Sequence, residues 1–207
     1  MVTTKTRVIS AKGDRWLPEA LAVVRDGGLV AFPTDTVYGL GGLASRAGAV
    51  EAIFLAKVRP EERSIPILVA GWTEVRGIAL PVPPAERLAA AFWPGPLTIV
   101  MERDPSLPAA IGPKGTVGVR APNHAVALAL LRKAGPLATS SANLFGDPSP
   151  RTAADVLGTL GGRIDLLIDG GQTPGGRPST VVDCTGEMPR LLRSGPITLE
   201  AILAVWR

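Results

Sequence analysis

The stretch AGAVEAIFLAKVRPEERSIPILVAG, residues 47–71, decides the fold of this 207-residue chain because it contains a helix, its stop and the next strand. Apolar side chains recur there every third or fourth residue, which is the spacing of one buried helical face. Pro60 ends this helix because proline has no backbone N–H to donate. The apolar run IPILVAG, residues 65–71, then predicts a short buried strand.

The same alternation of helix and strand continues on both sides of this stretch. Helices are expected at 16–28, 47–58, 84–93, 124–135, 152–162 and 198–206. Strands are expected at 6–10, 29–34, 65–71, 97–103, 116–121, 136–140, 165–171, 179–185 and 189–194. This order predicts an α/β or α+β fold around one mixed, twisted sheet, with antiparallel pairing near the C-terminus. No linker divides the chain, so one domain over residues 1–207 is expected.

The amino-acid composition limits which kinds of protein this chain can be and which kinds of partner it can bind. The formal net charge of +4 favours anionic partners without distinguishing a nucleotide from an RNA. Cys184 is the single cysteine, which excludes an internal disulfide framework and fits a reducing cytoplasm. One histidine and one cysteine are too few for a usual structural zinc site, so no metal site is expected. No apolar run approaches the roughly 20 residues that cross a bilayer, so a soluble cytoplasmic protein is expected.

Three cations lie where the helix of residues 47–58 must end. Lys57 continues the apolar stripe and should point inward, whereas Arg59, directly before Pro60, should be extended. Once the chain straightens, residues two apart share a side, so Lys57 and Arg59 could converge on one anionic ligand, with Arg63 next in the sequence. The alternative is that they only complement the helix dipole. On this stretch alone the two interpretations carry equal weight.

The stretch PLATSSANLFGDPSP, residues 136–150, ends a predicted strand in small polar residues. Ser141 and Asn143 lie two apart, so both could offer hydrogen bonds to phosphate or carboxylate oxygens at the strand's carboxyl end. The alternative is a plain turn whose side chains bond their own backbone. A nucleophilic serine is less favoured than either, because only His124 could act as its base and no GxSxG motif is present.

The stretch FPTDTVYGLGGLA, residues 32–44, carries glycines at the spacing of a dinucleotide-binding fingerprint. The fingerprint requires a strand that ends directly before the first glycine, and the strand expected at 29–34 ends too early. We therefore expect a polar loop at the end of that strand, able to grip a small polar substrate or serving only as a turn. The polar residues of this loop are Thr34, Asp35, Thr36 and Tyr38.

Further arginines lie near the ends of predicted strands, beside Gly or Pro, where functional arginines tend to collect. These are Arg120, Arg177 and Arg193. Singly, each fits a solvated surface charge. Together with the cations near Pro60, they would form a groove suited to several phosphate charges. His124 is expected at the start of a helix, in a capping or exposed position.

Seven blocks occur in an order that resembles the YrdC-type threonylcarbamoyl-AMP synthase family. They are FPTDTVYGLG, AKVRP, FWPGPLT, VGVRAPNH, SSAN, STVVD and LRSGPIT, and they run from about Val30 to Thr198. The resemblance implies a single YrdC-like domain with a twisted, open mixed sheet, flanking helices and a basic concave groove. Longer members append a second domain after a linker, and this chain is expected to work without one.

The resemblance also implies site residues. The family's KxR and SxN elements fall on Lys57, Arg59, Ser141 and Asn143, which would surround the ATP phosphates as the catalytic group. The ATP contacts it implies are Arg59, Arg63, Thr116, Ser141, Ser149 and Arg193. The threonine contacts it implies are Thr36, Arg120, Thr139 and Ser179, with Arg120 as the partner of the amino-acid carboxylate.

The implied reaction converts L-threonine, bicarbonate or CO2, and ATP into threonylcarbamoyl-AMP and pyrophosphate. It is the first step of threonylcarbamoyladenosine formation on transfer RNA, so tRNA and downstream transfer proteins are implied partners. Mg²⁺ would arrive with the ATP rather than occupy a protein cage. Because carbamates are unstable in water, a closing loop is expected, with GGQTPGGRPS, residues 170–179, as the candidate.

Two other functions use the same basic groove. The first is an RNA-binding module, which would carry aromatic residues beside the arginines as stacking platforms. The second is a domain that senses a nucleotide or amino acid without turnover. Oligomeric state, downstream protein partners and selectivity among amino acids leave no signal in the sequence.

Overall fold

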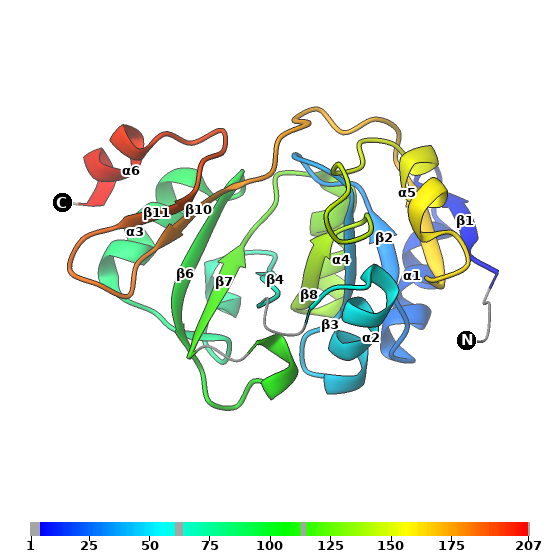
Figure 1. Ribbon diagram of the computed structural model, residues 1–207, viewed down its shortest axis with the longest axis horizontal. Coiled ribbons are helices and arrows are strands. Elements are labelled where there is room, and N and C mark those ends of the chain that lie inside the picture. Colours follow the sequence, from blue (N-terminus) through cyan, green and yellow to red (C-terminus); the bar gives the residue numbers. More distant parts are fainter. Residues whose placement is uncertain (1–4, 61–63, 113–114, 207) are drawn as a thin grey trace.

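The structure, a computed structural model, describes residues 5–60, 64–112 and 115–206 (Figure 1). Within these residues, eleven strands form one mixed sheet in the order β1-β9-β2-β3-β8-β4-β7-β6-β10-β11, with β5 paired to β6. The strands are β1 (Arg7–Ser10), β2 (Val30–Phe32), β3 (Gly39–Leu43), β4 (Ile67–Leu68), β5 (Ala79–Leu80), β6 (Leu97–Arg103), β7 (Thr116–Arg120), β8 (Leu137–Ser141), β9 (Leu166–Asp169), β10 (Thr180–Asp183) and β11 (Arg190–Arg193).

The six α-helices predicted from the sequence are present in the described residues, with ends that coincide with the predicted ones, lie one to three residues inside them or lie one residue beyond. They are α1 (Trp16–Arg25), α2 (Ala47–Lys57), α3 (Pro83–Phe92), α4 (Ala125–Ala134), α5 (Ala153–Leu160) and α6 (Leu199–Trp206). Two short 3-10 helices are added, η1 (Trp72–Glu74) and η2 (Ala109–Ile111). The predicted α/β fold with a mixed sheet is confirmed, and so is antiparallel pairing near the C-terminus, between β10 and β11.

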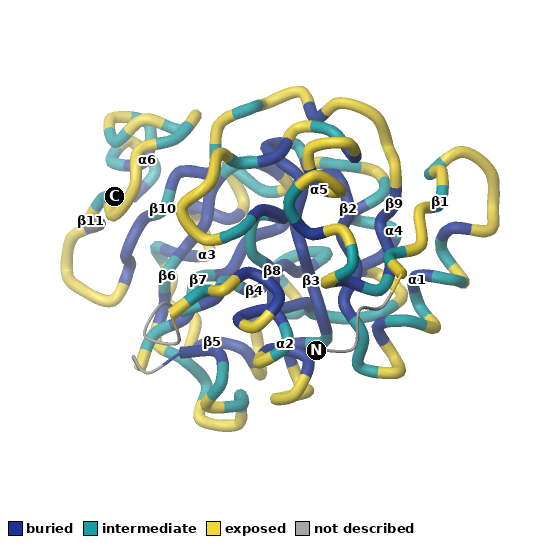
Figure 2. The backbone as a smooth tube through the Cα atoms, turned by 45° about the vertical axis from the view of Figure 1, so that its right-hand side comes forward, coloured by how far each residue is buried: buried dark blue, intermediate teal, exposed yellow. Residues whose placement is uncertain are grey.

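The helices bury both faces of the sheet near β2 and β9. Val30 and Phe32 of β2 pack in a cluster with α1 and α4, whereas Ala31 between them packs in the larger cluster with α2. This alternation follows from the two-residue period of a strand, which sends neighbouring side chains to opposite faces. At the other end of the sheet, α3 and α6 lie side by side, and the Arg87 guanidinium donates to the carbonyl of Trp206 at 2.6 Å (Figure 1). Figure 2 shows the central strands buried and most connecting loops exposed.

Strand β3 is the main element that the sequence did not predict. Its sequence GLGGL offers no period of apolar and polar side chains, so it was expected to be part of a loop. The structure pairs it antiparallel with both β2 and β8. Gly41 lies between the Phe32 ring and the Thr139 hydroxyl, each of which would be 3.0 Å from an added Cβ. Glycine is therefore required here by close packing between strands.

The connection from β9 to β10, residues 170–179, crosses from one part of the sheet to the other (Figure 1). It is bonded to the β2–β3 loop on the way. The Tyr38 hydroxyl donates to the Gly171 carbonyl at 2.7 Å, and the Gly176 N–H donates to the Thr36 carbonyl at 2.8 Å. These bonds hold the segment expected to be a lid against the β2–β3 loop. Its closure over a substrate stays a prediction.

Within residues 5–60, 64–112 and 115–206, no helix is both long enough and apolar enough to cross a membrane.

The packing of β3 predicts that replacing glycine by alanine has opposite effects on stability at two positions. Gly41→Ala should destabilise the fold by about 1–3 kcal/mol, because the added methyl overpacks a buried site. Gly158→Ala should stabilise it by about 0.5–1 kcal/mol, because Gly158 is exposed inside α5 with no atom within 4 Å of an added Cβ. Urea denaturation of both variants measures the two values. Equal effects of the same sign would contradict the packing described for β3.

Candidate active site

A pocket of about 330 Å³ opens over the middle of the sheet, with walls from β3, β4, β6, β7, β8, β10 and β11. Most of the site residues predicted from the sequence line it. These are Thr36, Arg59, Arg120, Thr139, Ser141, Ser149, Ser179 and Arg193. They come from segments separated by up to about three quarters of the chain, so only the fold brings them together. Gly39 and Gly118 leave the floor of the pocket low because neither carries a side chain.

Three of the predicted residues that the structure describes are not in the lining. Lys57 and Asn143 are buried, at 1% and 5% exposure. Thr116 is half-buried at the start of β7 and outside the pocket wall. Arg63 lies outside the described residues.

Lys57 points inward, as the helical stripe predicts, and it does not belong to the pocket lining that includes Arg59. Its ammonium donates to the backbone carbonyls of Ser141 and Asn143, each at 2.5 Å. Val58 has a left-handed backbone with φ of 51°, so the helix ends there and Arg59 turns toward the pocket. Lys57 thus supports the buried side of the Ser141–Asn143 turn.

The environment of Lys57 changes its protonation equilibrium. Burial, together with the positive charge of Arg59, lowers the pKa of Lys57 to about 8, while Asp147 acts in the opposite direction. The two carbonyl acceptors orient the ammonium beneath the turn. A lysine in this position fixes backbone geometry at the pocket wall.

Asn143 completes the same turn. Its side-chain N–H groups donate to the carbonyls of Leu144 and Asp147 at 2.9 and 2.7 Å. Its Oδ1 atom is buried without a hydrogen-bond partner among the described residues. The turn interpretation of SSAN therefore applies to Asn143, while Ser141 reaches the pocket.

Arg59 reaches the pocket from the end of α2. Its guanidinium donates to the Ser64 carbonyl at 3.1 Å and lies 5.6 Å from the centre of the Phe145 ring. Both contacts orient a planar cation at the pocket wall next to Ser141.

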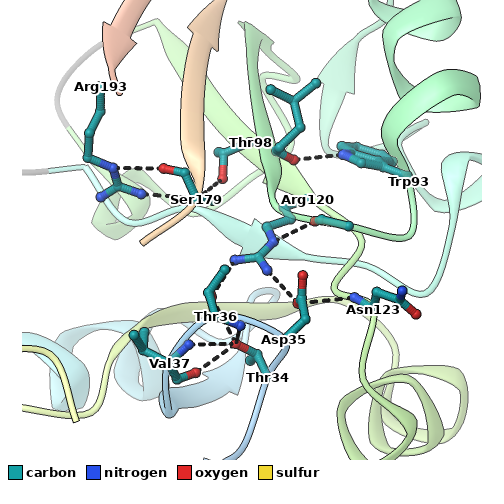
Figure 3. Close-up of polar contacts among 12 residues, drawn as sticks. Thr34, Asp35, Thr36, Val37, Trp93, Thr98, Arg120, Asn123, Ser179 and Arg193 are labelled. Atoms are coloured by element: carbon teal, nitrogen blue, oxygen red, sulfur yellow. Dashed lines mark hydrogen bonds and ion pairs between the residues drawn. The ribbon is translucent and has the colours of Figure 1, made fainter. Parts of the chain in front are cut away.

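Arg120 is buried, at 6% exposure, and contacts with neighbouring residues fix the orientation of its side chain (Figure 3). Its Nε donates to the Gly95 carbonyl at 2.9 Å and its Nη1 to the Thr36 hydroxyl at 3.0 Å. Its Nη2 forms an ion pair with Asp35 at 2.5 Å. Burial lowers the pKa of Arg120, and Asp35 acts to raise it. The guanidinium remains charged, since the arginine side chain is not deprotonated in proteins.

Arg193 lies across the pocket and is held by Ser179 (Figure 3). Its Nε and Nη2 donate to the carbonyl and hydroxyl of Ser179, each at 3.0 Å. The Ser179 hydroxyl is also 2.8 Å from the Thr98 hydroxyl. Thr98 was not among the site residues predicted from the sequence. A threonine in the mainly apolar strand LTIVMER could have indicated it, because a buried hydroxyl needs a hydrogen-bond partner.

His124 and Cys184 have little part in this site. His124 is the N-cap residue of α4, at the predicted position, and is half-buried, but its side chain makes no capping hydrogen bond. Burial lowers the pKa of His124. Cys184 is buried as predicted, and burial raises the pKa of its thiol to about 12. In the described part of the chain, no group of three or more His, Cys, Asp or Glu residues could hold a metal ion.

Comparisons with known proteins give the context of this pocket. The Sua5/YciO/YrdC family model, described as "Telomere recombination", matches residues 22–195. A putative threonylcarbamoyl-AMP synthase of Mycobacterium tuberculosis is 41% identical over 193 residues, covering 92% of this chain and 89% of that protein. Threonylcarbamoyl-AMP synthase of Bacillus subtilis is 43% identical over 199 residues, covering 93% of this chain and 57% of that protein.

A solved structure is also similar. The structure of Pyrococcus abyssi Sua5 complexed with L-threonine superposes with a TM-score of 0.92 at 42% sequence identity. The match covers 98% of this chain and 61% of that chain, so this chain spans about three fifths of the archaeal protein.

The buried ammonium of Lys57 predicts a pH-dependent stability. Between its folded pKa of about 8 and the ordinary lysine value of 10.5, the unfolded state binds more protons, so unfolding becomes less favourable as pH rises. Across this window the wild type should gain roughly 3 kcal/mol relative to Lys57→Met. Urea denaturation of both proteins from below pH 8 to above pH 10.5 measures the difference. Parallel stability curves would show that burial does not lower the pKa of Lys57 in the folded state.

Proposed function

This chain belongs to the Sua5/YciO/YrdC family, and on that premise we propose that it is a threonylcarbamoyl-AMP synthase. Its substrates are L-threonine, bicarbonate or CO2, and ATP, and its products are threonylcarbamoyl-AMP and pyrophosphate. The observation that supports this proposal most strongly is the pocket itself. Three arginines from distant segments, Arg59, Arg120 and Arg193, line one hollow whose walls also carry small hydroxyl side chains.

The proposed division of the pocket follows its polar groups. ATP lies along Arg59, Arg193, Ser141 and Ser149, with Thr116 and Arg63 as outer contacts. Threonine lies against Arg120, Thr36, Thr139 and Ser179. The two parts meet at Ser179, which accepts hydrogen bonds from Arg193. Lys57 and Asn143 hold the turn that presents Ser141 to the phosphates, a role supported by their buried hydrogen bonds.

The chemistry requires two bond-forming steps, and the second joins two negatively charged groups. The threonine amine, after losing a proton, attacks the carbon of CO2 derived from bicarbonate and forms a carbamate. A carbamate oxygen then attacks the α-phosphorus of ATP, and the bond from the α-phosphorus to the bridging oxygen breaks to release pyrophosphate. Cations between the reactants offset their repulsion and stabilise charge that grows on the phosphates. This mechanism needs no side-chain nucleophile.

Mg²⁺ enters as part of the nucleotide substrate, because Mg²⁺ usually keeps several waters and binds through substrate phosphates. The hydroxyl groups and arginines of the pocket can donate hydrogen bonds to the phosphate oxygens of such a complex that do not contact Mg²⁺. In this assignment the enzyme is a nucleotidyltransferase, since it transfers an AMP group to the carbamate.

The product is the activated intermediate for threonylcarbamoyladenosine formation on tRNA. We place this single-domain protein, residues 1–207, in the cytoplasm with tRNA and downstream transfer proteins as its partners. The RNA-binding or sensing alternative is less favoured, because Tyr38 is the one aromatic residue among those described in the pocket lining. Its hydroxyl is bonded to the Gly171 carbonyl, so it does not form the stacking platform that single-stranded RNA requires.

The proposal predicts a strict requirement for three substrates. Pyrophosphate release by the pure protein should need ATP, threonine and bicarbonate together, and omission of any one should reduce it to background. A coupled phosphate assay after pyrophosphatase measures the rate. Pyrophosphate release without threonine, or retention of RNA without any turnover, would contradict the synthase assignment.

The two ends of the pocket predict separate kinetic effects. Arg120→Lys keeps the charge but loses the planar fork, so the KM for threonine should rise about 10- to 100-fold with little change in the KM for ATP. Arg193→Lys should show the reverse pattern. Arg132→Lys, on the exposed last turn of α4, is the matched control. Equal changes in both KM values for either pocket variant would refute the division of the site.

A further inference from the structure

The arginines on the two sides of the pocket differ in how their charge is compensated. Arg120 forms an ion pair with Asp35, whereas Arg193 has no carboxylate within ion-pair distance in the part of the chain that the structure describes. The printed bonds of Arg193 go to neutral oxygens of Ser179. One side of the pocket is therefore close to neutral, and the other carries an uncompensated positive charge.

Asp35 is well fixed in its position behind Arg120 (Figure 3). Its Oδ1 accepts from Arg120 Nη2 at 2.5 Å and from the backbone N–H of Asn123 at 3.1 Å. Its side chain is only 12% exposed, and it is not part of the pocket lining. Asp35 therefore acts on the pocket through Arg120.

Arg120 keeps donors for a ligand despite these bonds. A guanidinium has five N–H groups, and the described contacts of Arg120 to Gly95, Thr36 and Asp35 use one each. Two N–H groups remain without a partner among the described residues, on a side chain that lines the pocket. The neighbours fix the plane of the guanidinium and leave room for a carboxylate.

The proposed reaction brings several anions into one small pocket. Bicarbonate, the triphosphate and pyrophosphate would each compete for an uncompensated buried guanidinium, since charge attracts all of them without regard to shape. Threonine differs because it is a zwitterion with no net charge. A guanidinium whose charge is balanced by a carboxylate can still hydrogen-bond the threonine carboxylate, while it attracts polyanions less.

We propose that Asp35 is a positioning and specificity-determining residue that reserves Arg120 for the zwitterionic amino acid and keeps anionic substrates and products at the Arg193 side. This inference rests on the proposed function and adds to it a physical reason, based on net charge, why each substrate binds at its own side of the pocket. The same pair explains why a buried arginine is stable at the amino-acid side, because an unpaired buried charge is strongly destabilising.

Asp35→Asn tests this rule because the amide oxygen can accept the same two hydrogen bonds without the charge. Calorimetric binding of threonine is measured without nucleotide, alone and with pyrophosphate as competitor. Pyrophosphate should leave threonine binding by the wild type nearly unchanged and should weaken binding by Asp35→Asn about tenfold. Asp35→Glu should restore part of the resistance, and Asp14→Asn, at an exposed position, should behave as the wild type.

A second probe reports on the ligand's own charge. 3-Hydroxybutyrate is threonine without its amino group and is therefore a simple anion. The ratio of its affinity to that of threonine should rise about tenfold in Asp35→Asn, because the neutral variant no longer disfavours net negative ligands. A general loss of structure would weaken both ligands equally and leave this ratio unchanged.

Three results would overturn the inference or its premise. Unchanged competition and an unchanged affinity ratio in folded Asp35→Asn would show that Asp35 is only structural. Should that variant fail to fold, strong competition between pyrophosphate and threonine in the wild type overturns the inference by itself. Failure of the three-substrate reaction would instead overturn the proposed function, whereas turnover with unchanged competition removes only the role of Asp35.

Discussion

The ion pair between Asp35 and Arg120 is the interaction on which the pocket depends. Asp35 lies in the β2–β3 loop and Arg120 at the end of β7, and two strands, β8 and β4, separate β3 from β7 in the sheet. A bond across that separation is possible because twist brings strand ends toward one another over a concave face. The pair thus closes one end of the hollow and compensates a charge that burial alone would make unstable.

In the rest of the site, each residue type has a distinct structural role. Glycines at positions 39 and 118 keep the floor low, hydroxyl groups supply neutral hydrogen bonds, and arginines stand at the sides. The hydroxyl of Ser179 links the last two groups, because it contacts both Arg193 and Thr98. A phosphate chain and an amino acid need these features together, since each carries several oxygens that must lose water before they react.

The sequence predicted the elements whose side chains follow a clear period. Strand β6 was predicted with its observed bounds because its first five residues, LTIVM, are mainly apolar. The inward direction of Lys57 followed from the apolar stripe of α2. Strand β3 was missed because GLGGL has almost no side chains from which a period can be read. The hydrogen-bond partners of Lys57 were not predicted either. They are the backbone carbonyls of Ser141 and Asn143, and because every residue has a carbonyl, the sequence does not indicate which ones accept.

By itself the sequence determined the α/β class, the order of the helices and most strands, and the set of polar and cationic residues from which a site could be built. It did so because burial and backbone preference act over short distances along the chain. Only the tertiary structure decided that Lys57 and Asn143 lie beneath the pocket wall, that Arg59, Arg120 and Arg193 face one hollow, and that Asp35 compensates one of these arginines. Those outcomes depend on distances between remote segments, which the pairing and twist of the sheet fix.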